Sequence, residues 1–126
     1  MEMITNAINW FEIPVADFNR AKKFYSTIYD FDMPEMEMDG AKMGILLHDQ
    51  EKGIGGAIIK TEGMEPSARG IRVYLNGGSD LSTVLSRVEG AGGKIVMPKT
   101  LIGDGMGHYA VFEDTEGNQI GIHSNA

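Results

Sequence analysis

The sequence predicts an α+β protein of two βαβββ units, whose sheets form one open, cup-shaped mixed β-barrel with helices outside. Strand-like alternation is interrupted by two stretches of helical spacing and punctuated by 17 glycines. The order of elements then repeats at a shift of about 63 residues, which gives units of about 5–61 and 70–124. A chain of 126 residues suits one such domain, residues 1–126. Because one unit cannot bury its own sheet, we expect the two sheets to share a cleft.

The first unit opens with the clearest strand and helix of the chain. Large residues alternate between two faces from Trp10 to Val15. Asp17 follows, and its side chain can accept a hydrogen bond from the first turn of a helix, which predicts an N-cap. The helix itself is predicted by an apolar stripe at helical spacing: Phe18, Ala21, Phe24, Tyr25 and Ile28. Pro34 prevents its continuation.

Three short strands are predicted for the rest of the first unit. Glu35–Met38 alternates polar and apolar residues as a half-buried strand does. Asp39-Gly40 is a strong hairpin-turn signal, after which Lys42–His48 returns as the second strand of the hairpin. Asp49–Gly53 predicts a polar turn, and Gly55–Thr61 predicts the closing strand.

The second unit starts after a polar connection and repeats the strand and helix. Ile71–Asn76 predicts the strand, and Ser79 or Asp80 is the expected helix cap. The helix carries a regular apolar stripe: Leu81, Val84, Leu85 and Val88. Three glycines follow this stripe, and we expect them to end the helix in a left-handed conformation: Gly90, Gly92 and Gly93.

Three strands also complete the second unit. Lys94–Met97 and Gly107–Glu113 are separated by a turn at Gly103–Gly105. Asp114–Asn118 predicts the next turn, and Gln119–His123 predicts the last strand.

Composition narrows the class of function. The absence of cysteine excludes disulfides and thiolate chemistry, and a net charge of −7 opposes binding to nucleic acid or anionic lipid. No apolar run is long enough to cross a membrane. The first ten residues, MEMITNAINW, lack the pattern of a secretion signal. We therefore expect a cytoplasmic protein.

The two ends of the chain resemble those of a known family. The stretch WFEIPVADFNRAKKFY is similar to the opening strand and helix of the vicinal oxygen chelate superfamily, and YAVFEDTEGNQIGIH is similar to its closing hairpin. That superfamily includes glyoxalase I, bleomycin-resistance proteins and extradiol dioxygenases. With the strand GGAIIK, these segments resemble an uncharacterised bacterial glyoxalase-like subgroup. The resemblance covers essentially the whole chain and implies the glyoxalase-like fold and a homodimer.

The resemblance also implies where a divalent metal would bind, on the first and last strands of each unit. The first-strand positions fall on Trp10 and Arg72, and a closing-strand glutamate falls on Gly121. The closing strand of the first unit offers no ligand at the matching place: Gly56, Ala57 and Ile58. Because these residues supply neither imidazole nor carboxylate oxygen, the family metal positions are not retained and no cofactor is expected. A site displaced to Glu12 and His123 is a weaker alternative.

A different set of polar groups is predicted on the inner faces of the sheets. By alternation, Glu12 shares a face with Trp10, and Gln119 and His123 share a face with Gly121. We expect them to meet, across the cleft, the first strand of the second unit, which carries Arg72, Tyr74 and Asn76. A partly buried Glu12 could transfer protons, and an arginine there could hold a carboxylate or phosphate. A purely structural ion pair between Glu12 and Arg72 is equally consistent with the sequence.

Three functions are therefore open, the third weaker than the others. The first is a glyoxalase-like enzyme of unknown reaction that uses Glu12 as its catalytic group; the resemblance suggests a lyase. Its substrate contacts would be Trp10, Arg72, Tyr74, Asn76, Gln119 and His123. The second is a non-catalytic binder, like the bleomycin-resistance members, that sequesters an aromatic or cationic compound. A metal-dependent lyase or dioxygenase with displaced ligands is a third reading.

Overall fold

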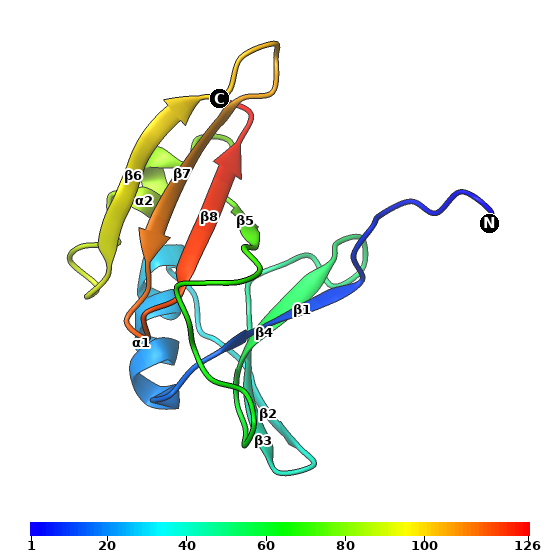
Figure 1. Ribbon diagram of the computed structural model, residues 1–126, viewed down its shortest axis with the longest axis vertical. Helices are drawn as coiled ribbons and strands as arrows, with labels where there is room; N and C mark the ends of the chain where they lie inside the picture. The colour runs from blue at the N-terminus through cyan, green and yellow to red at the C-terminus, as the bar shows by residue number, and fades with distance from the viewer.

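Two βαβββ halves follow one another in the computed structural model, which describes residues 1–126 (Figure 1). The first half contains β1 (Trp10–Pro14), α1 (Phe18–Tyr29), β2 (Glu35–Met38), β3 (Ala41–Ile45) and β4 (Gly55–Lys60). The second half contains β5 (Tyr74–Asn76), α2 (Ser82–Leu85), β6 (Lys94–Leu101), β7 (His108–Glu113) and β8 (Gln119–Ser124). The predicted α+β class and order of elements are confirmed.

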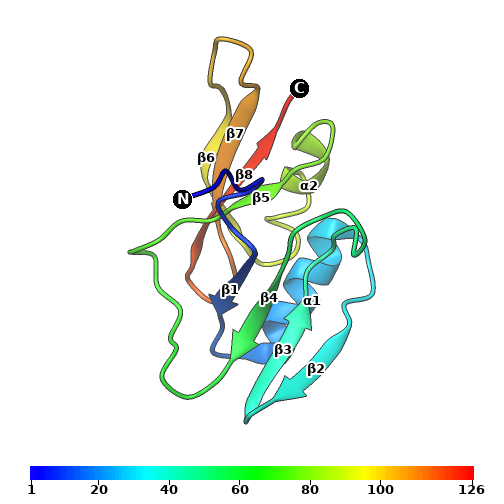
Figure 2. The same cartoon turned by 90° about the vertical axis from the view of Figure 1, so that its right-hand side faces the viewer.

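Each half forms one four-stranded sheet with the same topology. The strand orders are β1-β4-β3-β2 and β5-β8-β7-β6. In both sheets the first and last strands of the half pair in parallel, and the other neighbours are antiparallel. The two sheets stand at an angle to one another, which leaves the predicted cup open (Figures 1 and 2).

Helix α1 supplies much of the core between the sheets. Asp17 caps it as predicted, since its carboxylate accepts a hydrogen bond from Arg20 N at 3.0 Å. Asp30 ends the helix in the left-handed conformation, with φ 52°. The whole predicted stripe is buried: Phe18, Ala21, Phe24, Tyr25 and Ile28. These side chains belong to one cluster of 19 buried apolar residues drawn from both halves, so the halves share a core.

The turn between β7 and β8 ties the second half to the first. Asn118 donates from Nδ2 to the carbonyl of Pro14 at 2.8 Å and accepts a hydrogen bond from Ser67 N at 2.9 Å. The buried Asp114 accepts a hydrogen bond from the Tyr25 hydroxyl at 2.8 Å. These contacts fix the ends of β1 and β8 relative to one another.

Glu116, in the same turn, binds the first turn of α1. Its carboxylate accepts hydrogen bonds from the backbone N–H groups of Ala16 at 3.0 Å and Asp17 at 2.7 Å. It also forms an ion pair with Arg20 at 2.7 Å. The Glu116 side chain is fully covered, although that of Arg20 is about half exposed. A carboxylate here satisfies free helical N–H groups and favours the helix dipole.

Three strand predictions need correction. The predicted strand Ile71–Asn76 is shortened to β5, because Gly70 adopts φ 101° and only the last three residues pair with β8. Strand β2 is exposed rather than half-buried, because it lies at the edge of its sheet. Strand β6 continues beyond Met97 to Leu101 with two register shifts. An edge strand tolerates the proline that this extension contains.

Helix α2 is shorter than its apolar stripe suggests. The four stripe residues are buried as predicted, but regular α-helix covers only Ser82–Leu85. Ser79 does not cap it, whereas Asp80 accepts a hydrogen bond from Ser82 N at 2.9 Å. Of the three glycines after the stripe, Gly92 adopts a left-handed conformation. Neither helix has the length and apolar character needed to cross a membrane.

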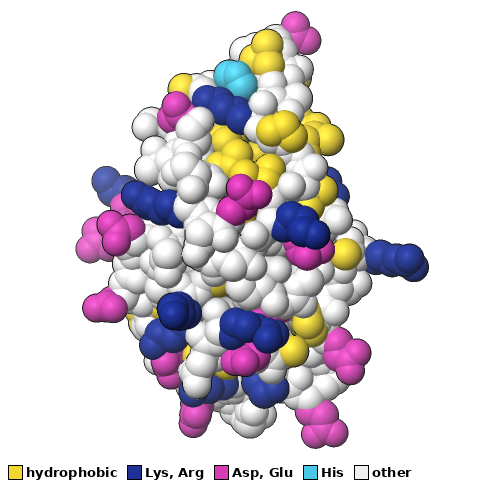
Figure 3. Space-filling view, turned by 90° about the vertical axis from the view of Figure 1, so that its left-hand side faces the viewer, with side chains coloured by type: hydrophobic (Ala, Val, Ile, Leu, Met, Phe, Trp, Pro, Cys, Tyr) yellow, Lys and Arg dark blue, Asp and Glu magenta, His cyan; other side chains and the backbone are white.

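Exposed apolar side chains gather along β6 and the loop that follows it. They are Val96, Met97, Leu101, Ile102 and Met106. On the face shown in Figure 3, hydrophobic side chains lie mainly in the upper part, and acidic and basic side chains are interspersed below. Two of these residues, Met97 and Ile102, also line the cavity of the second sheet.

Candidate functional site

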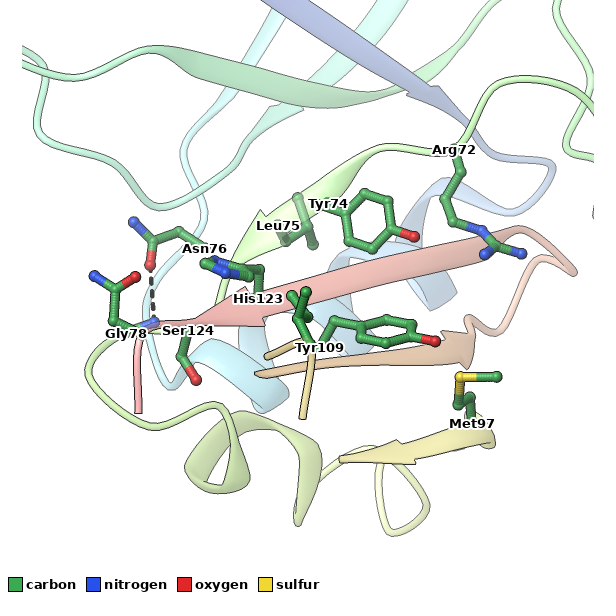
Figure 4. Close-up of a pocket in the computed structure, with 11 residues that line it drawn as sticks. Arg72, Tyr74, Leu75, Asn76, Gly78, Met97, Tyr109, His123 and Ser124 are labelled. Carbon is green, nitrogen blue, oxygen red and sulfur yellow. Dashed lines mark hydrogen bonds between the residues drawn. The ribbon is translucent and has the colours of Figure 1, made fainter. Parts of the chain in front are cut away.

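A cavity of about 720 Å³ lies on the face of the second sheet opposite the core (Figure 4). Cavities of this size can enclose a small organic molecule. Its walls come from β5 to β8 and from the adjoining loops. Eleven residues line it: Arg72, Tyr74, Leu75, Asn76, Gly78, Met97, Ile102, Tyr109, His123, Ser124 and Asn125.

Strand register explains why these side chains converge. Tyr74 pairs with Gly121 in the parallel β5–β8 ladder, and Tyr109 pairs with His123 across β7 and β8. Successive residues point to opposite faces, so Leu75, Ala110 and Ile122 enter the core while their neighbours face the cavity.

Two tyrosines form an aromatic surface in the cavity. The ring centroids of Tyr74 and Tyr109 are 6.4 Å apart, with their planes inclined by 60°. The Tyr74 ring covers Gly121 so closely that a Cβ atom on residue 121 would overlap it. The glycine therefore allows Tyr74 to lie over β8, and Tyr74 lines the cavity and remains 52% exposed. A planar ring could stack on one of these tyrosines and contact the other edge to face.

Polar groups surround this aromatic pair. Arg72 donates from Nη2 to Gln119 Oε1 at 3.1 Å. The Oδ1 atom of Asn76 accepts a hydrogen bond from Gly78 N at 2.8 Å, and its amide N–H groups remain available. His123 Nε2 lies 2.7 Å from the carbonyl of Met106. Because a carbonyl only accepts, Nε2 carries the proton of this bond and Nδ1 is the free nitrogen.

Residues 7–122 match the family model Glyoxalase/Bleomycin resistance protein/Dioxygenase superfamily. The chain belongs to this superfamily. No curated protein sequence matches the chain.

Solved structures show the superfamily fold at low sequence identity. TnmS3, an antibiotic binding protein from Streptomyces sp. CB03234, has a TM-score of 0.66 and 21% identity, covering 99% of this chain and 100% of that chain. A glyoxalase/bleomycin resistance protein from Albidiferax ferrireducens has a TM-score of 0.69 and 14% identity, covering 94% and 98%. A mutant glyoxalase I from Zea mays has a TM-score of 0.67 and 17% identity, covering 92% of this chain but 46% of that one. These likenesses establish the fold alone.

Four of the seven site residues expected from the sequence line the same cavity: Arg72, Tyr74, Asn76 and His123. Gln119 does not line it, but its side chain holds the Arg72 guanidinium. Glu12 and Gln119 instead line a second cavity of about 440 Å³ beside β1. Trp10 lines neither of these cavities.

The structure does not bury Glu12 as the sequence suggested. The residue is exposed, and its carboxylate accepts a hydrogen bond from Trp10 Nε1 at 3.3 Å. The expected partial burial is wrong: Glu12 lies on the face of β1 opposite the buried Ile13, and that face is not packed into the core. Glu12 and Arg72 form no ion pair, and Glu12 does not meet His123 in the 720 Å³ cavity.

Sequence reasoning missed Tyr109, Met97 and Ile102 as cavity residues. Tyr109 was detectable, because it alternates with Ala110 and Phe112 in a strand that the sequence predicts correctly. Met97 lies at the register shifts of the edge strand β6 and Ile102 directly follows that strand, so alternation alone does not place them.

The side chains at the family's metal positions do not fit a divalent metal ion. Trp10 and Arg72 supply no suitable donor atom, and the Tyr74 ring occupies the space where a longer side chain on residue 121 would begin. No three histidine or acidic side chains are grouped so as to hold a metal elsewhere in the protein.

Proposed function

We propose that the protein binds a small planar aromatic molecule, without a metal, in the 720 Å³ cavity of the second sheet. The observation that carries this proposal is the Tyr74–Tyr109 pair, whose rings remain open to the cavity rather than packed in the core. Met97 and Ile102 add apolar contact, and soft methionine side chains adapt to varied ring shapes. A few polar groups around an apolar surface are typical of small-molecule sites.

Binding without turnover is the form of this function that we favour. Glu12, the carboxylate that the sequence suggests for proton transfer, lies outside the cavity, and no acidic side chain lines it. TnmS3, one of the proteins that share the fold, is an antibiotic binding protein. Its likeness to this chain is compatible with a binding role, which here rests on the cavity itself.

An enzyme, such as a glyoxalase-like lyase, is a second candidate because of His123. The hydrogen bond between His123 Nε2 and the carbonyl of Met106 orients the ring in the cavity wall. The free Nδ1 atom could then accept a proton from a bound molecule. In this form of the proposal, His123 rather than Glu12 is the proton acceptor.

Ligand-induced stabilisation tests the proposal. We expect the melting temperature to rise with planar aromatic compounds and not with aliphatic compounds of similar size and charge, because only the folded state binds. Tyr109→Ala should reduce the rise at a given ligand concentration, because affinity falls. Mass spectrometry of the recovered ligand separates the two forms, since a binder returns it unchanged. Stabilisation in Tyr109→Ala equal to that of the wild type would show that binding lies elsewhere.

We also propose that the chain pairs with a second copy of itself. The inner face of the first sheet exposes Trp10, Met36 and Met38 by 41%, 41% and 54%, next to a small apolar cluster around Met43 and Ile59. In a two-fold dimer the same surface of each copy meets its counterpart, so one exposed apolar face per chain is enough to form the interface. Light scattering should give twice the chain mass, and Met38→Glu should give the monomer. A monomeric wild type would refute the pairing.

A further inference from the structure

Arg72 is the one formally charged side chain among the eleven residues that line the cavity. This is unexpected in a protein of net charge −7, which has 18 acidic and 11 basic residues. The local charge of the cavity is therefore opposite to that of the whole molecule. A local positive charge favours an anion over a cation, whereas the overall charge of the protein would favour the reverse.

No carboxylate of the protein neutralises Arg72. The four ion pairs of the structure involve other residues. Its hydrogen-bond partner is the neutral amide oxygen of Gln119, and Glu113, which faces Gln119 across β7 and β8, forms no ion pair with it. Gln119 thus holds the guanidinium in place through one N–H and leaves its charge and other donors available.

The arrangement of the cavity places this charge at the end of an aromatic surface. Figure 4 shows Arg72 at one end of the cavity, with Asn76, Gly78 and Ser124 at the other and the tyrosine rings between them. Both tyrosine hydroxyls point toward the end where Arg72 lies. A ring stacked on one tyrosine and in edge contact with the other could therefore direct a substituent at its edge toward the guanidinium.

We propose that the cavity selects aromatic carboxylates, with the ring on the tyrosine pair and the carboxylate held by Arg72. This inference rests on the proposed binding function and specifies the chemical class of its ligand. Guanidinium and carboxylate can form paired, charge-assisted hydrogen bonds, and the two tyrosine hydroxyls supply further donors. Of the aromatic or cationic compound suggested by the sequence, this proposal keeps the aromatic ring and reverses the charge.

Three probes with the same ring separate charge from shape: 2-naphthoate, 2-naphthamide and 2-naphthylmethylammonium. Calorimetric titration of the wild type should show 2-naphthoate binding about tenfold more tightly than the amide, and the ammonium compound most weakly. Arg72→Gln should remove the preference for the carboxylate over the amide. Arg69→Gln is the matched control, because it removes the same charge from a residue outside this cavity.

The outcomes distinguish this inference from the function on which it rests. Equal binding of the three probes, or tightest binding of the ammonium compound, would overturn the inference and leave aromatic binding intact. An equal loss of preference in Arg69→Gln would also overturn it, because the effect would then come from net charge. Failure of all three probes to bind would contradict both proposals.

Discussion

The ring of Tyr74 lies directly over the backbone of Gly121, its register partner in the parallel β5–β8 pair. Residue 121 is also where the superfamily resemblance would place a metal-binding glutamate. The glycine leaves room for an aromatic ring at this position, and Tyr109 lies beside that ring on the neighbouring strand. Glycine at position 121 thus has two effects: it provides no metal-binding side chain, and it leaves room for the aromatic ring in the cavity.

Gly121→Ala should weaken aromatic binding without unfolding the protein. The added methyl group would displace the Tyr74 ring from its place over β8, while the backbone of residue 121 has no positive φ that would strain alanine. We expect affinity for 2-naphthoate to fall about fivefold to tenfold, since aromatic contacts contribute about 0.5–1.5 kcal/mol. Calorimetric titration measures this change.

Gly90→Ala is the control for that substitution. A Cβ on residue 90 would meet no atom within 4 Å, and its φ is not positive, so affinity should be unchanged. Wild-type affinity in Gly121→Ala would show that the position of the Tyr74 ring does not matter for binding.

Tyr109→Phe and Tyr109→Ala should separate the two contributions of this tyrosine. Phenylalanine keeps the ring and removes the hydroxyl, so binding of the neutral 2-naphthamide should stay within about twofold of wild type. Alanine removes the ring, and affinity should fall about tenfold. Equal affinities in the wild type and both variants, measured by calorimetry, would count against stacking on Tyr109.

Glu12→Gln should leave ligand affinity within about twofold of the wild type, because Glu12 is exposed and lies outside the cavity. The same variant tests the catalytic role that the sequence suggested for this residue. If a reaction of the wild type is identified, retained turnover in Glu12→Gln would exclude Glu12 as the proton carrier. Lost turnover with intact binding would restore it.

Removing divalent metal should not affect binding. The family positions carry Trp10, Arg72 and Gly121, none of which offers a metal-binding side chain, so dialysis against EDTA should leave the affinity for 2-naphthoate unchanged. A loss of affinity that added Zn²⁺ or Ni²⁺ reverses would contradict a metal-free site. Elemental analysis of the purified protein provides an independent measurement.

Glu116 is expected to make an important contribution to stability. Burial raises the pKa of its carboxyl, but hydrogen bonds from Arg20, the Asp17 backbone, Thr115 and the Ala16 backbone outweigh this effect and lower the pKa to about 2. Glu116→Gln should reduce the free energy of unfolding at neutral pH by about 1–2 kcal/mol, a range that allows for solvent screening around Arg20. The exposed Glu89→Gln is the control, and it should change stability little. Urea denaturation measures both.

The Glu116 contribution should also depend on pH. A carboxyl whose folded pKa is lowered from 4.5 to about 2 adds full stability above about pH 4.5 and loses it as pH falls toward 2. The stability difference between the wild type and Glu116→Gln should therefore shrink from about pH 7 to about pH 3. Asp114, whose pKa burial raises, acts in the opposite direction but is present in both proteins. A pH-independent difference would contradict the ion-pair account.

Local patterns were sufficient to predict most elements of the fold. The Asp17 cap and the apolar stripe of α1 act within a few residues, so the sequence determines them without knowledge of the partners. Asp39 and Gly40 form the predicted turn at φ 50° and 82° for the same reason. The extent of β5 was not predictable in this way, because it depends on how far the separate strand β8 remains alongside.

The lining of the candidate cavity was predicted in part, because alternation assigns a side chain to a face of a sheet but does not show what covers that face. This sufficed for Tyr74 and His123, which lie on one face of the second sheet. It failed for the burial of Glu12, because the face of β1 that carries Glu12 is not packed into the core, whereas the opposite face with Ile13 is. Tyr109 was overlooked although its strand was correctly predicted.

The position of a bound ring tests the central claim most directly. We would titrate ¹⁵N-labelled protein with 2-naphthoate and follow the backbone amide signals by NMR. The account predicts that the largest shift changes map to Tyr74, Tyr109, Gly121 and His123, around the cavity of the second sheet. Changes centred on Trp10 and Glu12, with the signals of that cavity unmoved, would contradict it.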